Sequence, residues 1–283
     1  MYDFRFLIGD IHLEMHSTFP MEVQANLLPF LEDTNISGDI VYQLEKAPEF
    51  GWRPENLGTP VLDKGLSRIY RLANGYYVKE DGVQGCQDWT IIKNNDWTHP
   101  HIYVSASVNR NYSISNSMSF PISLSLFDGV FLHASFIRWK NKGILFTGSS
   151  GTGKTTQAKL WQKLRGADIL NGDKALVRYG DTEWFSYGSP WAGSSHIYCN
   201  ERAPLKAIVV LRQAPQNRLT QLGKVQAFKH IFHQSNAPLF DSDLLSRTIS
   251  LLEQLVREIP VFLLECRPDE KAVKILENRL VHL

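Results

Sequence analysis

The sequence is poor in cysteine, and the few cysteines that it has are far apart. Cys86, Cys199 and Cys266 are the only ones among 283 residues, and no two of them form a C-x-x-C pair. A disulfide framework or a zinc site needs paired or clustered cysteines. We therefore expect neither in this protein.

The chain also lacks an excess of charge of one sign and any long apolar run. Its formal net charge is +1 at pH 7, which gives no electrostatic reason to expect a nucleic acid or an anionic membrane as a partner. No apolar stretch approaches the roughly 20 residues that a membrane-spanning helix needs. The N-terminus, residues 1–6, lacks the basic and apolar regions of a signal peptide. We expect a cytoplasmic protein that binds neither nucleic acid nor membrane.

The sequence does contain a complete phosphate-binding loop. Its residues are Gly148, Ser149, Ser150, Gly151, Thr152, Gly153, Lys154, Thr155 and Thr156. An apolar run at 144–146 precedes it and a helical pattern at 157–164 follows it. In such loops backbone N–H groups surround phosphate oxygens, the lysine reaches the β/γ-phosphates and the first threonine binds Mg²⁺. The segment predicts a site for ATP and Mg²⁺, with Thr155 as a metal ligand.

An acidic residue, Asp173, follows the next short apolar strand, at 169–171. Because consecutive elements usually neighbour each other in space, we expect Asp173 to lie beside Lys154 and Thr155. A carboxylate there could hold Mg²⁺ or accept the proton of an attacking hydroxyl. The alternative is a plain turn residue, since Asn-Gly-Asp is a composition that turns favour.

The loop and the Asn171-Gly172-Asp173-Lys174 segment together resemble the kinase superfamily of the HPr kinase/phosphorylase catalytic domain and ATP-dependent phosphoenolpyruvate carboxykinase. The sequence is most similar to the small HPr-kinase-like proteins of bacterial peptide-modification gene clusters, some of which phosphorylate a serine of a precursor peptide. The segment Leu132-His133-Ala134-Ser135 and the blocks at 187–193 and 203–208 resemble further motifs of that subgroup. The resemblance extends from about residue 129 to the C-terminus.

This resemblance implies transfer of the γ-phosphoryl group of ATP to a hydroxyl, first a peptide serine and second a small metabolite alcohol. Asp173 would be the general base and, with Thr155, a Mg²⁺ ligand, while Lys154 and His133 would offset developing charge. Three further residues are candidates for contact with phosphate or substrate, although each is also of a kind often found solvated or ion-paired: Lys174, His196 and Arg212. A homo-oligomer stays open.

The sequence departs from the kinase pattern at Gly172, where HPr kinases and many relatives carry the first of two aspartates. It also shows no clear equivalent of their Glu-Ile-Arg-Gly block. These differences keep a second interpretation open, a catalytically weak nucleotide-binding protein that regulates or presents a peptide. A carboxykinase reaction is disfavoured because the chain is much shorter than those enzymes.

The overall pattern predicts a fold of the α/β class, α+β overall, in two domains. Residues 1–128 form a smaller β-rich domain, with alternating apolar residues at 40, 42 and 44 and a hairpin turn at Asn74-Gly75. The run 105–119 is either an exposed strand pair or a loop. Residues 129–283 form a P-loop kinase domain with a mixed sheet. Helices are expected at 241–258 and 268–280, because apolar residues recur there at helical spacing.

Overall fold

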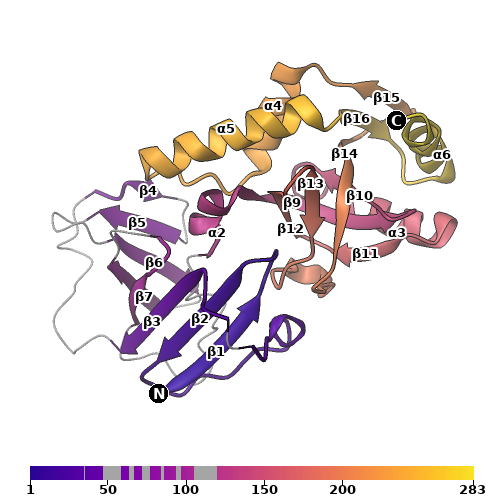
Figure 1. Cartoon of the computed structure of the whole chain (residues 1–283). Helices are drawn as coiled ribbons and strands as arrows, with labels where there is room; N and C mark the ends of the chain where they lie inside the picture. Colours follow the sequence, from indigo (N-terminus) through magenta and orange to yellow (C-terminus); the bar gives the residue numbers. More distant parts are fainter. Residues whose placement is uncertain are drawn as a thin grey trace. The chain divides into compact units, whose positions relative to one another are not determined.

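The computed structural model describes residues 1–34, 36–46, 59–63, 67–71, 77–83, 86–93, 97–104 and 120–283 (Figure 1). The chain divides into two compact units. The first consists of Met1–Ser123 and Pro238–Ser242, and the second of Leu124–Ala237 and Asp243–Leu283. The domain boundary expected between residues 128 and 129 stays a prediction.

The first unit is built on one eight-stranded sheet with the order β1-β2-β3-β8-β7-β6-β5-β4. Strands β2–β3 and β3–β8 pair in parallel and the other neighbours antiparallel. Ile40, Tyr42 and Leu44 are all fully buried, in keeping with their alternating spacing. The elements are β1 (Tyr2–Leu7), β2 (His12–Ser17), η1 (Leu28–Phe30), β3 (Ile40–Lys46), β4 (Leu62–Asp63), β5 (Ser67–Arg71), β6 (Tyr77–Val83), β7 (Cys86–Lys93), β8 (His101–Val104) and α2 (Phe120–Ser123).

Two of the sequence predictions fall outside the described residues. They are the turn at Asn74-Gly75 and the run 105–119. The strands that flank the turn, β5 and β6, pair antiparallel with Arg71 opposite Tyr77. This pairing is the arrangement that a hairpin requires.

The second unit combines a mixed sheet with four long helices. Strand β14 is parallel to both β10 and β16, and the remaining neighbours are antiparallel. The predicted α/β class with a mixed sheet is therefore confirmed. The elements are η3 (Leu124–Phe127), β9 (Gly129–Trp139), β10 (Lys142–Thr147), α3 (Lys154–Arg165), β11 (Asp168–Asn171), β12 (Lys174–Tyr179), β13 (Trp184–Tyr187), η4 (Gly193–Ser195), β14 (Arg202–Gln213), β15 (Arg218–Gln221), α4 (Lys224–Gln234), α5 (Ser242–Glu258), β16 (Val261–Cys266) and α6 (Glu270–Val281).

Helices cover the sheet of the second unit on both faces. Helices α3 and α6 share one apolar cluster with the sheet, and α4 and α5 share the other. The first cluster contains the fully buried Trp161, and the second contains Ile231 and Leu252. The sequence predicted neither helix α4 nor strand β15. In α4 only Ala227 and Ile231 are buried, so this helix carries a weak apolar stripe. Within the described part of the chain, no helix is both long and apolar enough to cross a membrane.

Strand β9 lies between the strand that leads into the loop and the strand that leads to Asp173. One edge of β9 pairs with β10, with Ala134 opposite Thr147. The other edge pairs with β11 and β12, with His133 opposite Lys174. Strand β9 thus separates the loop strand from the acidic strand, and His133, near the middle of β9, pairs with Lys174 on the strand that follows Asp173.

Candidate nucleotide and phosphoryl-transfer site

The phosphate-binding loop, residues 148–156, connects the end of β10 to the start of α3. Gly148 has a φ of +145°, which side-chain-bearing residues rarely adopt, and a Cβ there would lie 3.0 Å from Thr152 Oγ1 and 3.1 Å from the Leu211 carbonyl oxygen. The N-terminus of α3 has no side-chain cap and no acidic residue in its first turn. Its N–H groups are therefore left for an anion, which the helix dipole also favours.

Short-range hydrogen bonds hold the loop and its lysine. Thr152 Oγ1 donates to the Ser149 carbonyl at 2.8 Å. Lys154 is 7% exposed, and its Nζ donates to the carbonyls of Gly148 at 3.0 Å and Ser149 at 3.4 Å. Burial lowers the pKa of Lys154 below its ordinary value, and the Asp173 carboxylate opposes this effect. The ammonium group thus lies at the start of the loop and within the electrostatic reach of Asp173.

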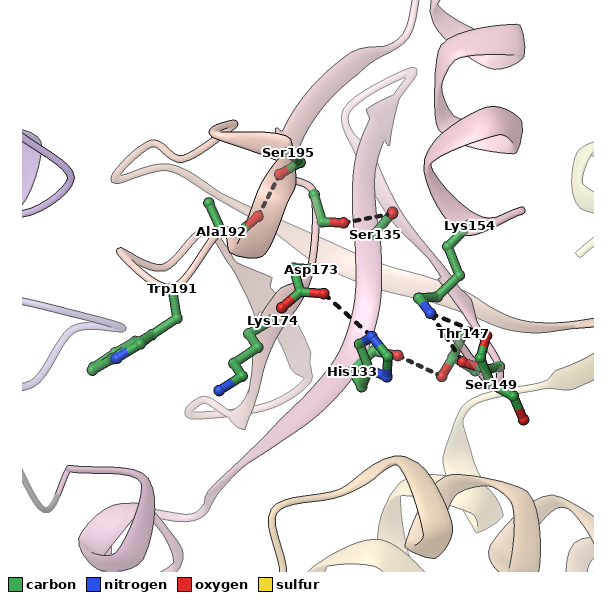
Figure 2. Close-up of polar contacts among 12 residues, drawn as sticks. His133, Ser135, Thr147, Ser149, Lys154, Asp173, Lys174, Trp191, Ala192 and Ser195 are labelled. Carbon is green, nitrogen blue, oxygen red and sulfur yellow. Dashed lines mark hydrogen bonds and ion pairs between the residues drawn. The ribbon is translucent and has the colours of Figure 1, made fainter. Parts of the chain in front are cut away.

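Asp173 lies in the turn between β11 and β12, and its carboxylate contacts the His133 ring. Asp173 Oδ1 is 3.2 Å from His133 Nε2, and the two side chains are 29% and 36% exposed. The His133 hydrogen bond is the main cause that lowers the pKa of Asp173, with help from the charges of His133, Lys174 and Lys154, while burial opposes the shift. Figure 2 shows His133 between Asp173 and the loop residues Lys154 and Ser149. The carboxylate is therefore ionised at neutral pH, and His133 lies between it and the loop.

A buried amide, Asn171, shapes the turn that carries Asp173; we refer to Asn171–Asp173 as the acid turn. Asn171 Oδ1 accepts from the backbone N–H groups of Asp173 and Lys174, each at 2.8 Å. Its Nδ2 donates to the Ser189 carbonyl at 2.9 Å, and Ser189 Oγ donates to the Lys174 carbonyl at 2.6 Å. Asn171 and Ser189 are both fully buried. The Asn-Gly-Asp turn composition was a signal for this geometry, but the sequence did not identify the role of Asn171 or Ser189.

Gly172 has no room for a side chain. A Cβ at this position would lie 2.0 Å from Ser195 Oγ and 2.3 Å from Ser195 Cβ. Ser195 is itself held in place, since its Oγ donates to the Ala192 carbonyl at 2.5 Å and accepts from the Ile197 N–H at 3.2 Å. The space that a side chain at position 172 would need is thus filled by Ser195.

The three lower-ranked candidates lie in different surroundings. Lys174 follows Asp173 directly, and Figure 2 shows its side chain directed away from Lys154, on the side of Trp191. His196 is exposed at the end of η4, and no described contact joins it to Asp173, His133 or Lys154. Arg212 Nη1 lies 3.4 Å from Glu265 Oε1, with 56% of the Arg212 side chain exposed.

Arg212 also lines a hollow of about 400 Å³ that the loop shares with α4. We call it the α4-side hollow. His230 and Gln234 of α4 line it together with loop residues 148–152. Burial is the first cause that lowers the pKa of His230, followed by the charges of Arg212 and His233. Neither His230 nor Gln234 was found from the sequence, because α4 itself was not predicted.

The protein groups near the loop could supply only part of the coordination shell of a Mg²⁺ ion. Thr155 supplies a hydroxyl at the start of α3, and Asp173 supplies the carboxylate. Among the described residues, no group of three or more His, Cys, Asp or Glu side chains could hold a metal ion by itself. Mg²⁺ commonly keeps several waters and binds through one or two carboxylates and substrate phosphates. The set therefore suits a metal that arrives with a nucleotide.

Comparisons with known proteins place the chain in a family. Among solved structures, the HPr(Ser) kinase/phosphatase from Coxiella burnetii is similar at 12% identity and a TM-score of 0.32, over 54% of this chain and 97% of that one. No curated protein matches the sequence. A family model described as SynChlorMet cassette protein ScmC matches residues 116–271. Because this match spans more than half of the chain and includes His133, the loop and Asp173, the protein belongs to the family of SynChlorMet cassette proteins ScmC.

Proposed function

We propose that this protein is an ATP-dependent kinase that transfers the γ-phosphoryl group to a hydroxyl. The observation that carries the proposal is the contact between the Asp173 carboxylate and His133 Nε2 at 3.2 Å, next to a loop whose lysine interacts electrostatically with the same carboxylate. A carboxylate kept ionised beside a phosphate-binding loop suits the base of a phosphoryl transfer. The most favoured acceptor is a serine of a peptide, and a small metabolite alcohol is second.

In the proposed reaction the acceptor oxygen attacks the γ-phosphorus, the bond from that phosphorus to the β,γ-bridging oxygen breaks, and ADP leaves. Asp173 accepts the proton of the hydroxyl. His133 orients the carboxylate and keeps it ionised, and Lys154 with the loop N–H groups holds the phosphates. Mg²⁺, held by Thr155 and Asp173 with phosphates and water, would neutralise charge on the phosphate oxygens. Positioning and electrostatics would supply most of the rate.

One observation favours a second candidate, a nucleotide-binding protein that regulates or presents a peptide without rapid transfer. Gly172 and Ser195 leave no space for a second carboxylate. One carboxylate must then serve both the metal and the acceptor. A slow or absent reaction would be the result if it cannot do both.

The acceptor is best sought among neighbouring gene products, because the family description names a cassette. We propose that the acceptor is a short peptide with a modifiable serine and that neither a nucleic acid nor a membrane is a partner. Transfer from γ-labelled ATP with Mg²⁺ to each such product, compared between wild type and Asp173→Asn, is the test. Transfer by the wild type but not by Asp173→Asn would support the kinase function.

A thermal-shift titration tests whether the site binds a nucleotide at all, which both candidate functions require. A ligand that binds only the folded state, present at a hundredfold excess over its Kd, raises the free energy of unfolding by about 2.7 kcal/mol. ATP binding without transfer to any neighbour-encoded product or small alcohol would favour the regulatory candidate. An unchanged melting temperature with ATP, GTP and their Mg²⁺ complexes would contradict both.

A further inference from the structure

The face of the sheet that carries His133 also carries two side chains that the proposed reaction does not use. Residues directly opposite each other on paired strands share a face, as do residues two apart on one strand. His133 pairs with Lys174, and Phe131 lies two residues before His133 on β9. Phe131, His133 and Lys174 therefore lie on one face, next to the acid turn.

Trp191 packs on this face from the segment that follows β13. Its ring meets the Phe131 ring edge-on, with centroids 5.2 Å apart and an interplanar angle of 79°. Hydrogen bonds join the segment to the acid turn and to β12: Asn171 Nδ2 donates to the Trp191 carbonyl at 3.4 Å, and Ser189 Oγ donates to the Lys174 carbonyl at 2.6 Å. Phe131, Lys174 and Trp191 thus lie together beside the acid turn, and we call these three side chains the acceptor wall.

The charge of Lys174 is available for a ligand. Lys174 is half-buried, and its Nζ forms no hydrogen bond or salt bridge with any residue of the described chain. The Asp173 carboxylate, whose pKa this charge helps to lower, contacts His133 instead. Figure 2 shows the Lys174 side chain on the Trp191 side of Asp173, whereas the loop with Lys154 lies on the other side. The anion that suits Lys174 is therefore not a phosphate held by the loop.

Two groups limit how a hydroxyl can reach Asp173. Gly193 has a φ of +53°, and a Cβ there would lie 2.7 Å from Asp173 Cγ, so the backbone at 193 lies against the carboxylate. His133 Nε2 lies 3.2 Å from Oδ1. The acceptor wall adjoins both, since Lys174 pairs with His133 and Trp191 is two residues before Gly193. An acceptor bound at Asp173 therefore has Lys174 and Trp191 as neighbours.

We propose that the acceptor wall selects a hydroxyl that has a carboxylate close by, with Lys174 binding the carboxylate and Trp191 packing against an apolar part of the acceptor. Asp173 and Lys174 are consecutive, so their Cα atoms are about 3.8 Å apart, close to the length of one extended residue. The carboxylate then belongs to an acidic residue beside the reacting serine, or to the C-terminus of a peptide that ends in that serine. The inference rests on the proposed function, because it takes Asp173 as the site of the acceptor.

Four synthetic peptides test the carboxylate preference and separate its two sources. Each has a single serine, preceded by leucine, and no other hydroxyl. In one pair glutamate or glutamine follows the serine and the C-terminus is amidated. The other pair ends in the serine, with a free or an amidated C-terminus. With γ-labelled ATP and Mg²⁺, we expect kcat/KM for at least one carboxylate peptide to be about fivefold above that of its neutral partner, the size expected for one partly exposed ion pair. Equal values within both pairs would overturn the proposal.

Variants assign the preference to the acceptor wall. Lys174→Gln should reduce the ratio within the preferred pair to about one, mainly through KM, and a ratio between two peptides cancels any effect of Lys174 on Asp173 itself. The matched control is Lys163→Gln, an exposed lysine of α3, which should keep the ratio. Trp191→Ala should raise KM for all four peptides and leave the ratio unchanged. An unchanged ratio in Lys174→Gln, or an unchanged KM in Trp191→Ala, would overturn the role given to that residue.

A binding measurement keeps this inference separate from the kinase function. The same peptides, with a photoreactive diazirine in place of the leucine side chain, should crosslink to the acceptor wall in the presence of ADP and Mg²⁺. The carboxylate member of the preferred pair should label it more strongly than its neutral partner. Such labelling without phosphoryl transfer would contradict the kinase alone. Equal labelling within both pairs, or labelling only of other segments, would overturn the acceptor wall.

Discussion

The loop and the acid turn are held in place by different kinds of contact. The loop is shaped mainly by its own glycines and by bonds between residues only a few positions apart, such as Thr152 to Ser149. The acid turn depends on residues far away in the sequence, among them Ser189 and His133. A short motif is therefore enough to predict a phosphate site. The surroundings of the Asp173 carboxylate, by contrast, depend on packing between distant segments.

The largest expected effect is on the chemistry of the acid turn. Asp173→Asn should lower phosphoryl transfer by roughly 10²-fold or more, the range expected for a lost general base, while nucleotide binding by the loop is retained. The matched control is Asp168→Asn, at the start of the strand β11 that leads to Asp173, where an exposed carboxylate pairs with Arg138. Rates of transfer from γ-labelled ATP give the answer, and a wild-type rate in Asp173→Asn would show that Asp173 is not the base.

Removing the buried amide should destabilise the protein more than removing a hydrogen bond of the loop. Asn171→Ala leaves the N–H groups of Asp173 and Lys174 without their acceptor, which costs about 1–3 kcal/mol. Thr152→Ala removes one local bond at a half-buried position and should cost only about 0.5–1.5 kcal/mol. Chemical denaturation of both variants measures the difference, and equal losses would contradict the distinction between loop and acid turn.

The tight contact at Gly172 predicts a coupled pair. Gly172→Ala should cost about 1–3 kcal/mol through overpacking against Ser195. Ser195→Gly in the same chain should recover part of this loss, so the two changes are not additive. Gly223→Ala is the control, because a Cβ there meets nothing within 4 Å. A Gly172→Ala variant as stable as the control would show that the segment around Ser195 yields easily.

The smallest effect concerns the pH dependence. In the proposed reaction Asp173 acts as a carboxylate, and its pKa lies below the ordinary 3.8, chiefly because of His133. His133→Gln should raise that pKa, so that transfer is lost at a higher pH on acidification than in wild type. At neutral pH the loss should be smaller than the roughly 10²-fold expected for a missing base.

Lys174→Gln provides the comparison for this shift. The Lys174 charge lowers the pKa of Asp173 less than His133 does, so the acid limb of the pH–rate profile should move less. The stability that the ionised Asp173 contributes is present above its ordinary pKa and is lost as the pH falls through the lowered one. An identical acid limb in wild type and His133→Gln would contradict the role given to His133.

The sequence by itself determined the elements whose cause is local. The glycine pattern of the loop and the strand at 168–171 follow from backbone preferences and from apolar spacing within short segments, and that the sheet is mixed follows from the order of strands and helices along the chain. Nearby residues are sufficient for such features, because they depend on φ angles and on the period of buried side chains.

Only the tertiary structure decided the rest. In the tertiary structure β9 lies between the loop strand and the acidic strand, and Ser195 occupies the space beside Gly172. The tertiary structure also brought α4, with His230, over the loop and gave Asn171 its partners. The physical reason is that steric room and hydrogen-bond partners depend on which distant segments pack together, and no local pattern in this chain encodes that choice.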